Sequence, residues 1–224
     1  MNPIATKISL QVSDSIGKVS ALLAAPAKPK AVLTLAHGAG AGMTHRFMEE
    51  LSDQLVQKSI AVMRFNFPYM ENKKGRPDPP AIAEKTVSSV INEAHKLYPK
   101  LPVYASGKSF GGRMSSQKLS KECPEFVKGI IFYGFPLHPA GKPSVDRAIH
   151  LKDISIPMLF LSGTKDTLAE LPLLEKVCGE LSTATLIKFE GADHSFKAGK
   201  KDTISWLADA TKQWTEKIIA AKNK

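Results

Sequence analysis

Hydrophobic and polar positions change their spacing regularly along the chain, and this spacing predicts alternating strands and helices. The segment TKISLQV (6–12) alternates polar and apolar residues, which is typical of a half-buried edge strand. The segment AVLTLAHG (31–38) is apolar along almost its whole length, as expected of a strand covered on both faces. After it, Phe47, Leu51 and Leu55 recur every four residues and predict a helix with one apolar face.

The same alternation continues to the end of the chain. Further strands are predicted at 60–67, 102–106, 128–135, 157–163 and 184–191, and further helices at about 80–98, 170–181 and 202–221. Alternating strands and helices predict parallel strands with helices on both faces of one sheet. Without repeats or linker-like composition, we expect a single domain over residues 1–224. In such sheets ligands bind beyond the carboxyl ends of the strands, so chemistry is expected in the loops there.

Composition narrows the class of protein. Hydrophobic residues make up 43% of the 224 residues and charged residues 23%, which is ordinary for a globular protein. No run of 18 apolar residues predicts a membrane span, and the first residues lack the pattern of a secretory signal. Two cysteines, Cys123 and Cys178, are too few for a disulfide framework, so we expect a reducing, cytoplasmic setting.

The net charge of +10 favours acidic partners in general. The lysines are nevertheless scattered, and their small clusters are not interleaved with aromatic residues that would stack on bases. We therefore expect no nucleic-acid partner. No cluster with metal-ligand spacing is visible in the sequence, and neither a metal nor an organic cofactor is predicted.

The stretch YASGKSFGGRM (104–114) places Ser109 between two glycines where a predicted strand becomes a helix. A serine hydroxyl is a poor nucleophile unless a base takes its proton and its geometry is fixed. Gly107 and Gly111 keep side chains out of a tight turn, and the helix starting at Phe110 directs N–H groups at developing negative charge. This G-x-S-x-G pattern predicts a nucleophile elbow, with a plain glycine-rich turn as the alternative.

Asp166 and His194 are the candidates for the other members of a catalytic triad. Asp166 directly follows the apolar run PMLFLSG, where a carboxylate would orient an imidazole. His194, in FEGADHSF, alone among six histidines follows a predicted strand and also comes after both Ser109 and Asp166. A histidine that acts as base must be neutral, so activity is expected to fall in acid. The alternatives are a solvated loop aspartate and an ordinary surface histidine.

The loop HGAGAG (37–42) is the candidate oxyanion hole. The backbone N–H groups of Ala39 and Phe110 are the expected donors, and His37 is expected to brace the loop. The loop also contains a G-x-G-x-G string. A phosphate site is the less favoured alternative, because the loop lacks the lysine and serine of a Walker motif and the spaced third glycine of a dinucleotide loop.

Taken in order, LAHGAG, GKSFGG, GTKD and ADHSF resemble the α/β-hydrolase superfamily over nearly the whole chain. RFNFPYM (64–70) and GFPLHPAGKP (134–143) are similar to segments of a small lidless branch of this superfamily, close to the dienelactone hydrolases. That branch also holds uncharacterised predicted hydrolases and a subunit of the nonspecific-lethal chromatin complex. The resemblance implies an α/β-hydrolase fold with a mostly parallel central sheet, helices on both faces, and the triad and oxyanion donors named above. It implies no substrate, and dienelactone hydrolases proper carry a cysteine where this chain has Ser109.

The shape of the site follows from the short connection at 140–156, whose 17 residues are too few for a helical cap domain. An open site favours short acyl esters or thioesters. The expected pocket walls lie just past strand ends and are Tyr69, Met70, Phe110, Phe135 and His138. Five cations are expected to make the mouth positive and to favour anionic substrates: Lys73, Lys74, Arg76, Lys108 and Arg113.

These features predict a serine hydrolase that cleaves carboxylic ester or thioester bonds of small molecules through an acyl-enzyme. Two alternatives stay open. The same triad runs peptidase, acyltransferase or perhydrolase chemistry on related scaffolds. The second alternative is a catalytically silent hydrolase-like scaffold that binds a protein partner. The chromatin-associated relative and the basic charge motivate it.

Overall fold

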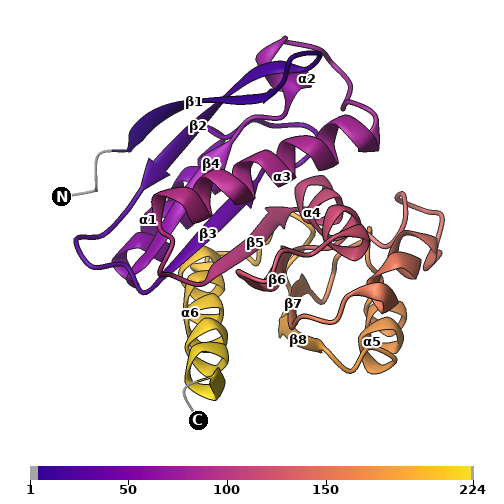
Figure 1. Cartoon of the computed structure of the whole chain (residues 1–224). Helices are drawn as coiled ribbons and strands as arrows, with labels where there is room; N and C mark the ends of the chain where they lie inside the picture. Colours follow the sequence, from indigo (N-terminus) through magenta and orange to yellow (C-terminus); the bar gives the residue numbers. More distant parts are fainter. Residues whose placement is uncertain (1–4, 223–224) are drawn as a thin grey trace.

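The predicted strands form one eight-stranded sheet in the computed structural model, which describes residues 5–222 (Figure 1). The strand order is β1-β2-β4-β3-β5-β6-β7-β8. The first three of these strands pair antiparallel and all later pairs are parallel, so the mostly parallel sheet predicted from the sequence is confirmed. The strands are β1 (Thr6–Ser13), β2 (Gly17–Ala24), β3 (Ala31–Ala36), β4 (Ile60–Phe65), β5 (Val103–Lys108), β6 (Val127–Tyr133), β7 (Met158–Gly163) and β8 (Ala184–Phe189).

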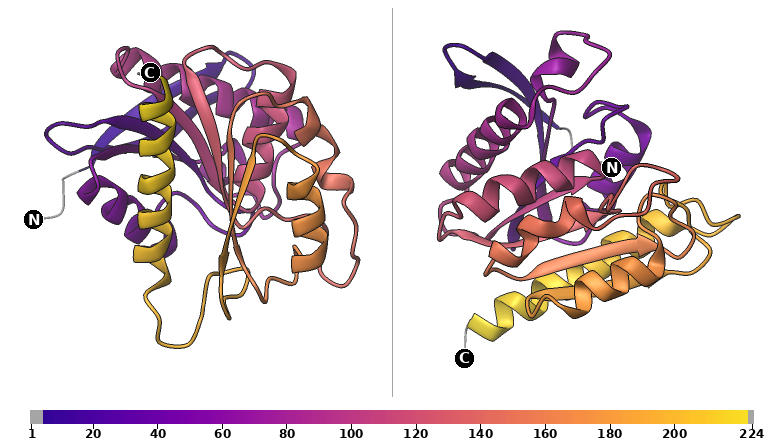
Figure 2. Two further views of the ribbon diagram at one scale, coloured as in Figure 1. Left: turned by 90° about the horizontal axis from the view of Figure 1, so that it is seen from below. Right: turned by 90° about the vertical axis from the view of Figure 1, so that its right-hand side faces the viewer.

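Helices cover both faces of this sheet (Figure 2). They are α1 (Arg46–Gln57), α2 (Pro68–Glu71), α3 (Pro80–Leu97), α4 (Phe110–Lys121), the 3-10 helix η1 (Asp146–Asp153), α5 (Leu171–Gly179) and α6 (Thr203–Lys222). The apolar sides of α3, α4 and α5 pack on one face, and those of α1 and α6 pack on the other. Each face therefore has its own hydrophobic core.

Strand β3 shows how the sequence pattern produces these two cores. Its six residues are all buried, as its continuous apolar run predicts. Side chains alternate along a strand, so Val32 contributes to the core under α3 while Leu33 contributes to the core under α1. Leu51 and Leu55 of α1 complete that second core, and both are fully buried.

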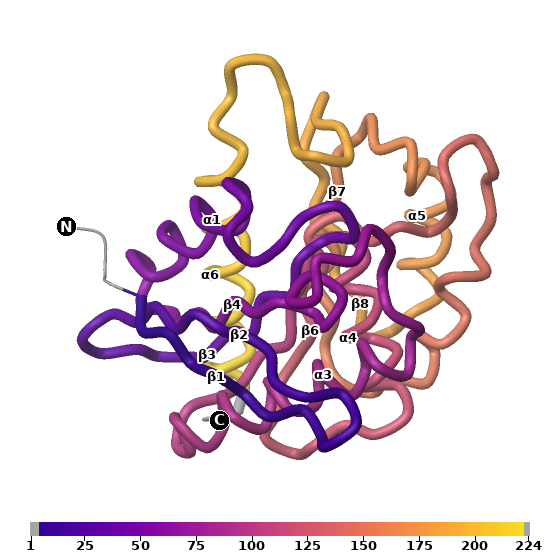
Figure 3. The backbone as a smooth tube through the Cα atoms, turned by 90° about the horizontal axis from the view of Figure 1, so that it is seen from above, coloured from indigo at the N-terminus to yellow at the C-terminus, as the bar shows by residue number. Residues whose placement is uncertain are grey.

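The carboxyl ends of the parallel strands lie along one edge of the sheet, where the connecting loops gather. Figure 3 shows the long loop between β8 and α6 passing beside α1 on this edge. The connection between β6 and β7 holds only η1, which packs against α4, so residues 5–222 contain no separate cap domain. No helix in this range is long and apolar enough to cross a membrane.

Candidate active site

Ser109 occupies the sharp turn from β5 into α4, as the sequence predicts. Its backbone has φ +50° and ψ −113°, which is strained for a residue with a side chain. The flanking glycines make the turn possible. A Cβ atom at Gly111 would lie 2.5 Å from the carbonyl oxygen of Ala36, and one at Gly107 would collide with the start of α4. The turn thus exposes the serine hydroxyl while its backbone packs against β3.

Three side chains from three loops meet at this turn. The Oγ atom of Ser109 lies 2.9 Å from Nε2 of His194, and Nδ1 of His194 lies 2.8 Å from Oδ2 of Asp166. Asp166 is only 3% exposed, and its Oδ1 atom accepts the backbone N–H of Leu168. The buried carboxylate favours the imidazole tautomer that carries its proton on Nδ1, which leaves Nε2 free to accept the serine proton. The three residues proposed from their order in the sequence are therefore brought into one hydrogen-bonded line.

Asp193, the residue before His194, makes different hydrogen bonds from those of Asp166. Its Oδ1 atom accepts the backbone N–H groups of Ser195 and Lys197, at 2.8 and 2.9 Å. This carboxylate therefore shapes the loop that carries His194, and Asp166 is the carboxylate bonded to the imidazole.

The glycine-rich loop 37–42 lies against Ser109. A Cβ atom at Gly38 would lie 3.9 Å from the Cβ atom of Ser109. The first residue of an α-helix has no intrahelical acceptor for its N–H group, so the N–H of Phe110 is available at the same turn. Ala39 lines the same cavity as Ser109 and Phe110 directly follows Ser109, so their N–H groups remain the candidate oxyanion donors.

Two buried side chains brace this loop. His37 is fully buried; its Nδ1 atom lies 2.8 Å from the carbonyl oxygen of Gly38, and its Nε2 atom accepts the N–H of Phe67. Burial lowers the pKa of His37 to about 4, so its ring stays neutral and keeps both bonds at neutral pH. The hydroxyl of Tyr69 donates to the carbonyl oxygens of Gly38 and Ala39, at 3.2 and 3.0 Å, and burial raises the pKa of Tyr69.

A cavity of about 950 Å³ opens beside Ser109. Its walls are the glycine-rich loop, the beginning of α1, Leu168 and the loop before α6. Phe47 and Leu168 are partly exposed and supply apolar surface, Phe196 borders the cavity but is only 2% exposed, and His45, Arg46, Lys108, Lys197 and Lys201 supply polar or cationic surface. The cavity is thus bordered by segments that are distant in sequence and meet because α1 and α6 share one face of the sheet.

The pocket walls predicted from the sequence are wrong. Tyr69 and Phe135 are 1% exposed and His138 is fully buried, so these side chains offer no surface to a substrate. Phe135 packs on Phe132 and Phe160, and Tyr69 braces the oxyanion loop as described above. Met70 is partly buried beside Gly42, outside the cavity lining. The chain turns inward after β4 and β6, because aromatic side chains at these strand ends bury their rings against the core.

Of the five cations predicted at the mouth of the site, only one lines the cavity. Lys73, Lys74, Arg76 and Arg113 do not line the cavity, whereas Lys108 does. The cavity residues that sequence reasoning missed include Phe47, which its spacing assigned to the core face of a helix, and Phe196, which stands two residues after His194. The proximity of Phe196 to the predicted base was the one signal available for either.

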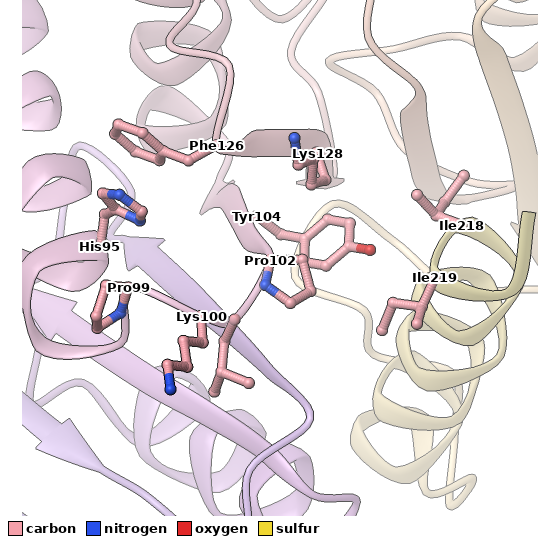
Figure 4. A pocket seen from close by; sticks show the side chains of 10 residues that line it. His95, Pro99, Lys100, Pro102, Tyr104, Phe126, Lys128, Ile218 and Ile219 are labelled. Carbon is pink, nitrogen blue, oxygen red and sulfur yellow. The ribbon is translucent and has the colours of Figure 1, made fainter. Parts of the chain in front are cut away.

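A second cavity, of about 340 Å³, lies at the amino ends of β5 and β6 (Figure 4). Ile218 and Ile219 of α6 line one side of it, and His95 and Phe126 line the other, with their rings stacked at a centroid distance of 3.9 Å. This cavity is at the opposite edge of the sheet from Ser109 and takes no part in the arrangement described above. Among residues 5–222, no group of three or more His, Cys, Asp or Glu side chains is placed to hold a metal ion.

Comparisons with known proteins agree with this architecture. A family model described as an alpha/beta hydrolase domain matches residues 29–221. The fold is similar to a dienelactone hydrolase from Anabaena variabilis (TM-score 0.77, 18% identity, 96% of this chain and 97% of that chain covered). It is also similar to a lidless α/β serine hydrolase from Xanthomonas campestris (TM-score 0.75, 18% identity, 94% and 95% covered) and to the esterase domain of a Rhodothermus marinus protein (TM-score 0.73, 14% identity, 95% and 98% covered). The resemblance to small lidless α/β-hydrolases drawn from the sequence motifs is confirmed.

Proposed function

The chain belongs to the alpha/beta hydrolase domain family, and from that premise we propose that it is a serine hydrolase of carboxylic ester or thioester bonds in small molecules. The observation that carries the proposal is the hydrogen-bonded line of Ser109, His194 and Asp166 beyond the carboxyl ends of β5, β7 and β8. The spacings of 2.9 and 2.8 Å are within the range through which a proton transfers between a nucleophile and its base.

Acylation begins when Oγ of Ser109 attacks the carbonyl carbon of the substrate and its proton passes to Nε2 of His194. The negative charge that develops on the carbonyl oxygen is held by the N–H groups of Ala39 and Phe110. The protonated imidazole then gives its proton to the leaving oxygen or sulfur, and the alcohol or thiol departs. The carboxylate of Asp166 stabilises the imidazolium through its hydrogen bond with Nδ1.

Deacylation repeats these steps with water. His194 takes a proton from a water molecule that attacks the acyl-enzyme, and the same N–H groups hold the second oxyanion. Collapse of this intermediate returns the proton to Oγ of Ser109 and releases the carboxylic acid. Each step uses groups that lie within or beside the hydrogen-bonded line.

The cavity favours small substrates with an apolar acyl part. Phe47 and Leu168 offer it apolar contact, and the cationic residues at the rim, Lys197 and Lys201, attract negative charge. Without a cap domain to cover the site, a short acyl chain suits this cavity better than a long lipid. These contacts support esters or thioesters of short acids, including those whose leaving group is anionic.

The test is a panel of short acyl esters, acyl thioesters and peptides, assayed with the wild type and Ser109→Ala. We expect turnover of esters or thioesters by the wild type and its loss in the variant, while Ser120→Ala, in the same helix, keeps wild-type turnover. Products formed with an added alcohol would identify acyltransferase chemistry, and cleavage of peptides alone would identify a peptidase. A folded wild type that turns over no member of the panel would contradict the proposal and favour a binding scaffold.

A further inference from the structure

Lys108 is the residue immediately before Ser109, and its side chain turns into the protein. Its Nζ atom donates a hydrogen bond to the backbone carbonyl oxygen of His194, at 2.5 Å. Its stem passes the oxyanion loop, since a Cβ atom at Gly38 would lie 3.7 Å from the Cγ atom of Lys108. One side chain thus touches the loops that carry the proposed base and the proposed oxyanion donor.

Two aromatic rings enclose the ammonium group. Nζ of Lys108 lies 5.3 Å from the centroid of the Phe196 ring and 5.9 Å from that of Phe47, and the two rings stack at 6.1 Å. These distances are within the range of cation–π attraction. On a third side Gly134 closes the space, because a Cβ atom there would lie 3.1 Å from Nζ and 3.4 Å from the ring of His194.

The backbone of Phe196 is held in an uncommon conformation to supply its ring. Its φ is +60°, a value that bulky residues rarely adopt. The hydroxyl of Thr203 donates to its carbonyl oxygen at 2.6 Å, and its own N–H donates to the carbonyl oxygen of Asp193. These bonds fix the backbone of Phe196, whose ring lies beside the ammonium group of Lys108.

Charged groups on two loops face Lys108. Burial lowers the pKa of Lys108 to about 8, and the carboxylates of Asp166 and Asp193 oppose this by favouring the cation. On the side of α1 the ammonium meets the Phe47 ring, and the other charged or titratable groups along the same cavity are His45, Arg46, Glu50, His194, Lys197 and Lys201. Lys108 is a cation at neutral pH and loses its proton in mildly alkaline solution.

We propose that Lys108 is a positioning residue that holds His194 within reach of Ser109 in the hydrolysis proposed above, on which this inference rests. The hydrogen bond to the His194 carbonyl ties the loop of the base to the residue next to the nucleophile. Lys108 thus fixes His194 relative to Ser109. When the loop before α6 moves, the distance between Nε2 of His194 and Oγ of Ser109 stays the same. Loss of the cation removes the charge-assisted bond and the attraction to both rings, so the imidazole drifts from Oγ.

The first test compares Lys108→Met and Lys108→Arg with the wild type and with Lys7→Met, a control at an exposed position on β1. In K108M we expect kcat for a neutral short-chain ester to fall about 100-fold, because a displacement of about 1 Å has an effect of that size. KM should change by less than about threefold, since the substrate contacts remain. K108R keeps a cation that donates hydrogen bonds and should recover part of the lost turnover, since its guanidinium is larger than the enclosed ammonium.

The pH profile gives a second readout that a purely structural role would not move. Wild-type turnover should fall above about pH 8 as Lys108 loses its proton, and this alkaline limb should be missing in K108R, because a guanidinium stays charged. An alkaline limb that persists in K108R would contradict the role of the Lys108 charge. If K108M raised KM for anionic esters only and left kcat unchanged, the ammonium of Lys108 would be a binding site for a substrate anion, and the proposal would be overturned.

Crystal structures of K108M and K108R separate this inference from the proposed function. In K108M we expect Nε2 of His194 beyond about 3.5 Å from Oγ of Ser109, outside hydrogen-bond range, and in K108R we expect the bond restored. A K108M structure that keeps the wild-type distance of 2.9 Å, with undiminished turnover, would overturn the inference. A displaced imidazole in a protein whose wild type hydrolyses no ester would support the positioning role and refute the proposed function alone.

Discussion

Replacing Lys108 with methionine should make the protein more stable while it loses activity. Burial lowers the pKa of Lys108 from 10.5 to about 8. Each pKa unit corresponds to about 1.4 kcal/mol, so keeping this side chain charged near neutral pH costs the folded state about 3 kcal/mol. Methionine has a similar length and no charge, but it loses the hydrogen bond to His194 and the ring contacts, which together contribute about 2 kcal/mol. We expect K108M to be more stable than the wild type by about 1 kcal/mol at neutral pH.

The dependence of this difference on pH follows from proton binding. Between about pH 8 and 10.5 the unfolded chain keeps the proton of Lys108 while the folded chain releases it. The unfolded state then binds more protons, so the free energy of unfolding of the wild type rises with pH in this window. K108M has no such group, and its advantage should shrink and reverse, with a total change of about 2–3 kcal/mol between neutral pH and about pH 10.

Urea unfolding of both proteins at the two pH values measures this change, because other titrating groups cancel in the difference between them. Lys7→Met serves as the control and should differ from the wild type by less than about 0.5 kcal/mol at both pH values. A K108M variant that is less stable than the wild type at neutral pH, by an amount that does not vary with pH, would show that burying the Lys108 charge does not destabilise the folded state. Lys108 would then stabilise the fold as an ordinary structural residue.

Three further predictions test the other parts of the site. Tyr69→Phe removes the hydroxyl that donates to two carbonyl oxygens of the oxyanion loop. We expect the free energy of unfolding in urea to fall by about 1 kcal/mol and ester turnover to slow about tenfold. Unchanged turnover would count against the bracing role. Gly111→Ala places a Cβ atom 2.5 Å from a β3 carbonyl oxygen and should destabilise by about 1–3 kcal/mol in thermal melts, while Gly75→Ala, in open space, should melt like the wild type. Added salt should shrink the rate ratio of anionic over neutral esters, because Lys197 and Lys201 are exposed at the cavity rim; a ratio that does not move with salt would argue against electrostatic attraction there.

The parts of this molecule that the sequence predicted well depend on local pattern and on order along the chain. An apolar run such as β3 is buried on both faces wherever it lies, so it identifies a central strand directly. Residues that follow parallel strands meet at one edge of the sheet, which is why the G-x-S-x-G pattern and the order of residues after strands predicted that Ser109, Asp166 and His194 lie together. These inferences need no knowledge of how helices pack.

The pocket could not be predicted in the same way, because its walls depend on tertiary packing. Phe47 and Phe196 are far apart in sequence and stack only because α1 and α6 lie on the same face of the sheet. Tyr69 and Phe135 follow strands as the catalytic candidates do, yet their rings turn into the core, where aromatic contacts bury them. Lys108 was expected at the mouth as a surface cation, and nothing local indicated that two rings and a backbone carbonyl would enclose it.

In the proposed function, Ser109 is a nucleophile activated by His194 and Asp166. Labelling with a fluorophosphonate, read by intact mass and peptide mapping, tests this directly and needs no knowledge of the natural substrate. We predict one adduct per chain on Ser109 in the wild type and in Ser120→Ala, none in Ser109→Ala, and labelling slowed by at least about 100-fold in His194→Ala. The absence of an adduct on the correctly folded wild type at neutral pH, where Lys108 keeps its proton, or equally fast labelling of His194→Ala, would show that Ser109 is not a nucleophile activated by His194.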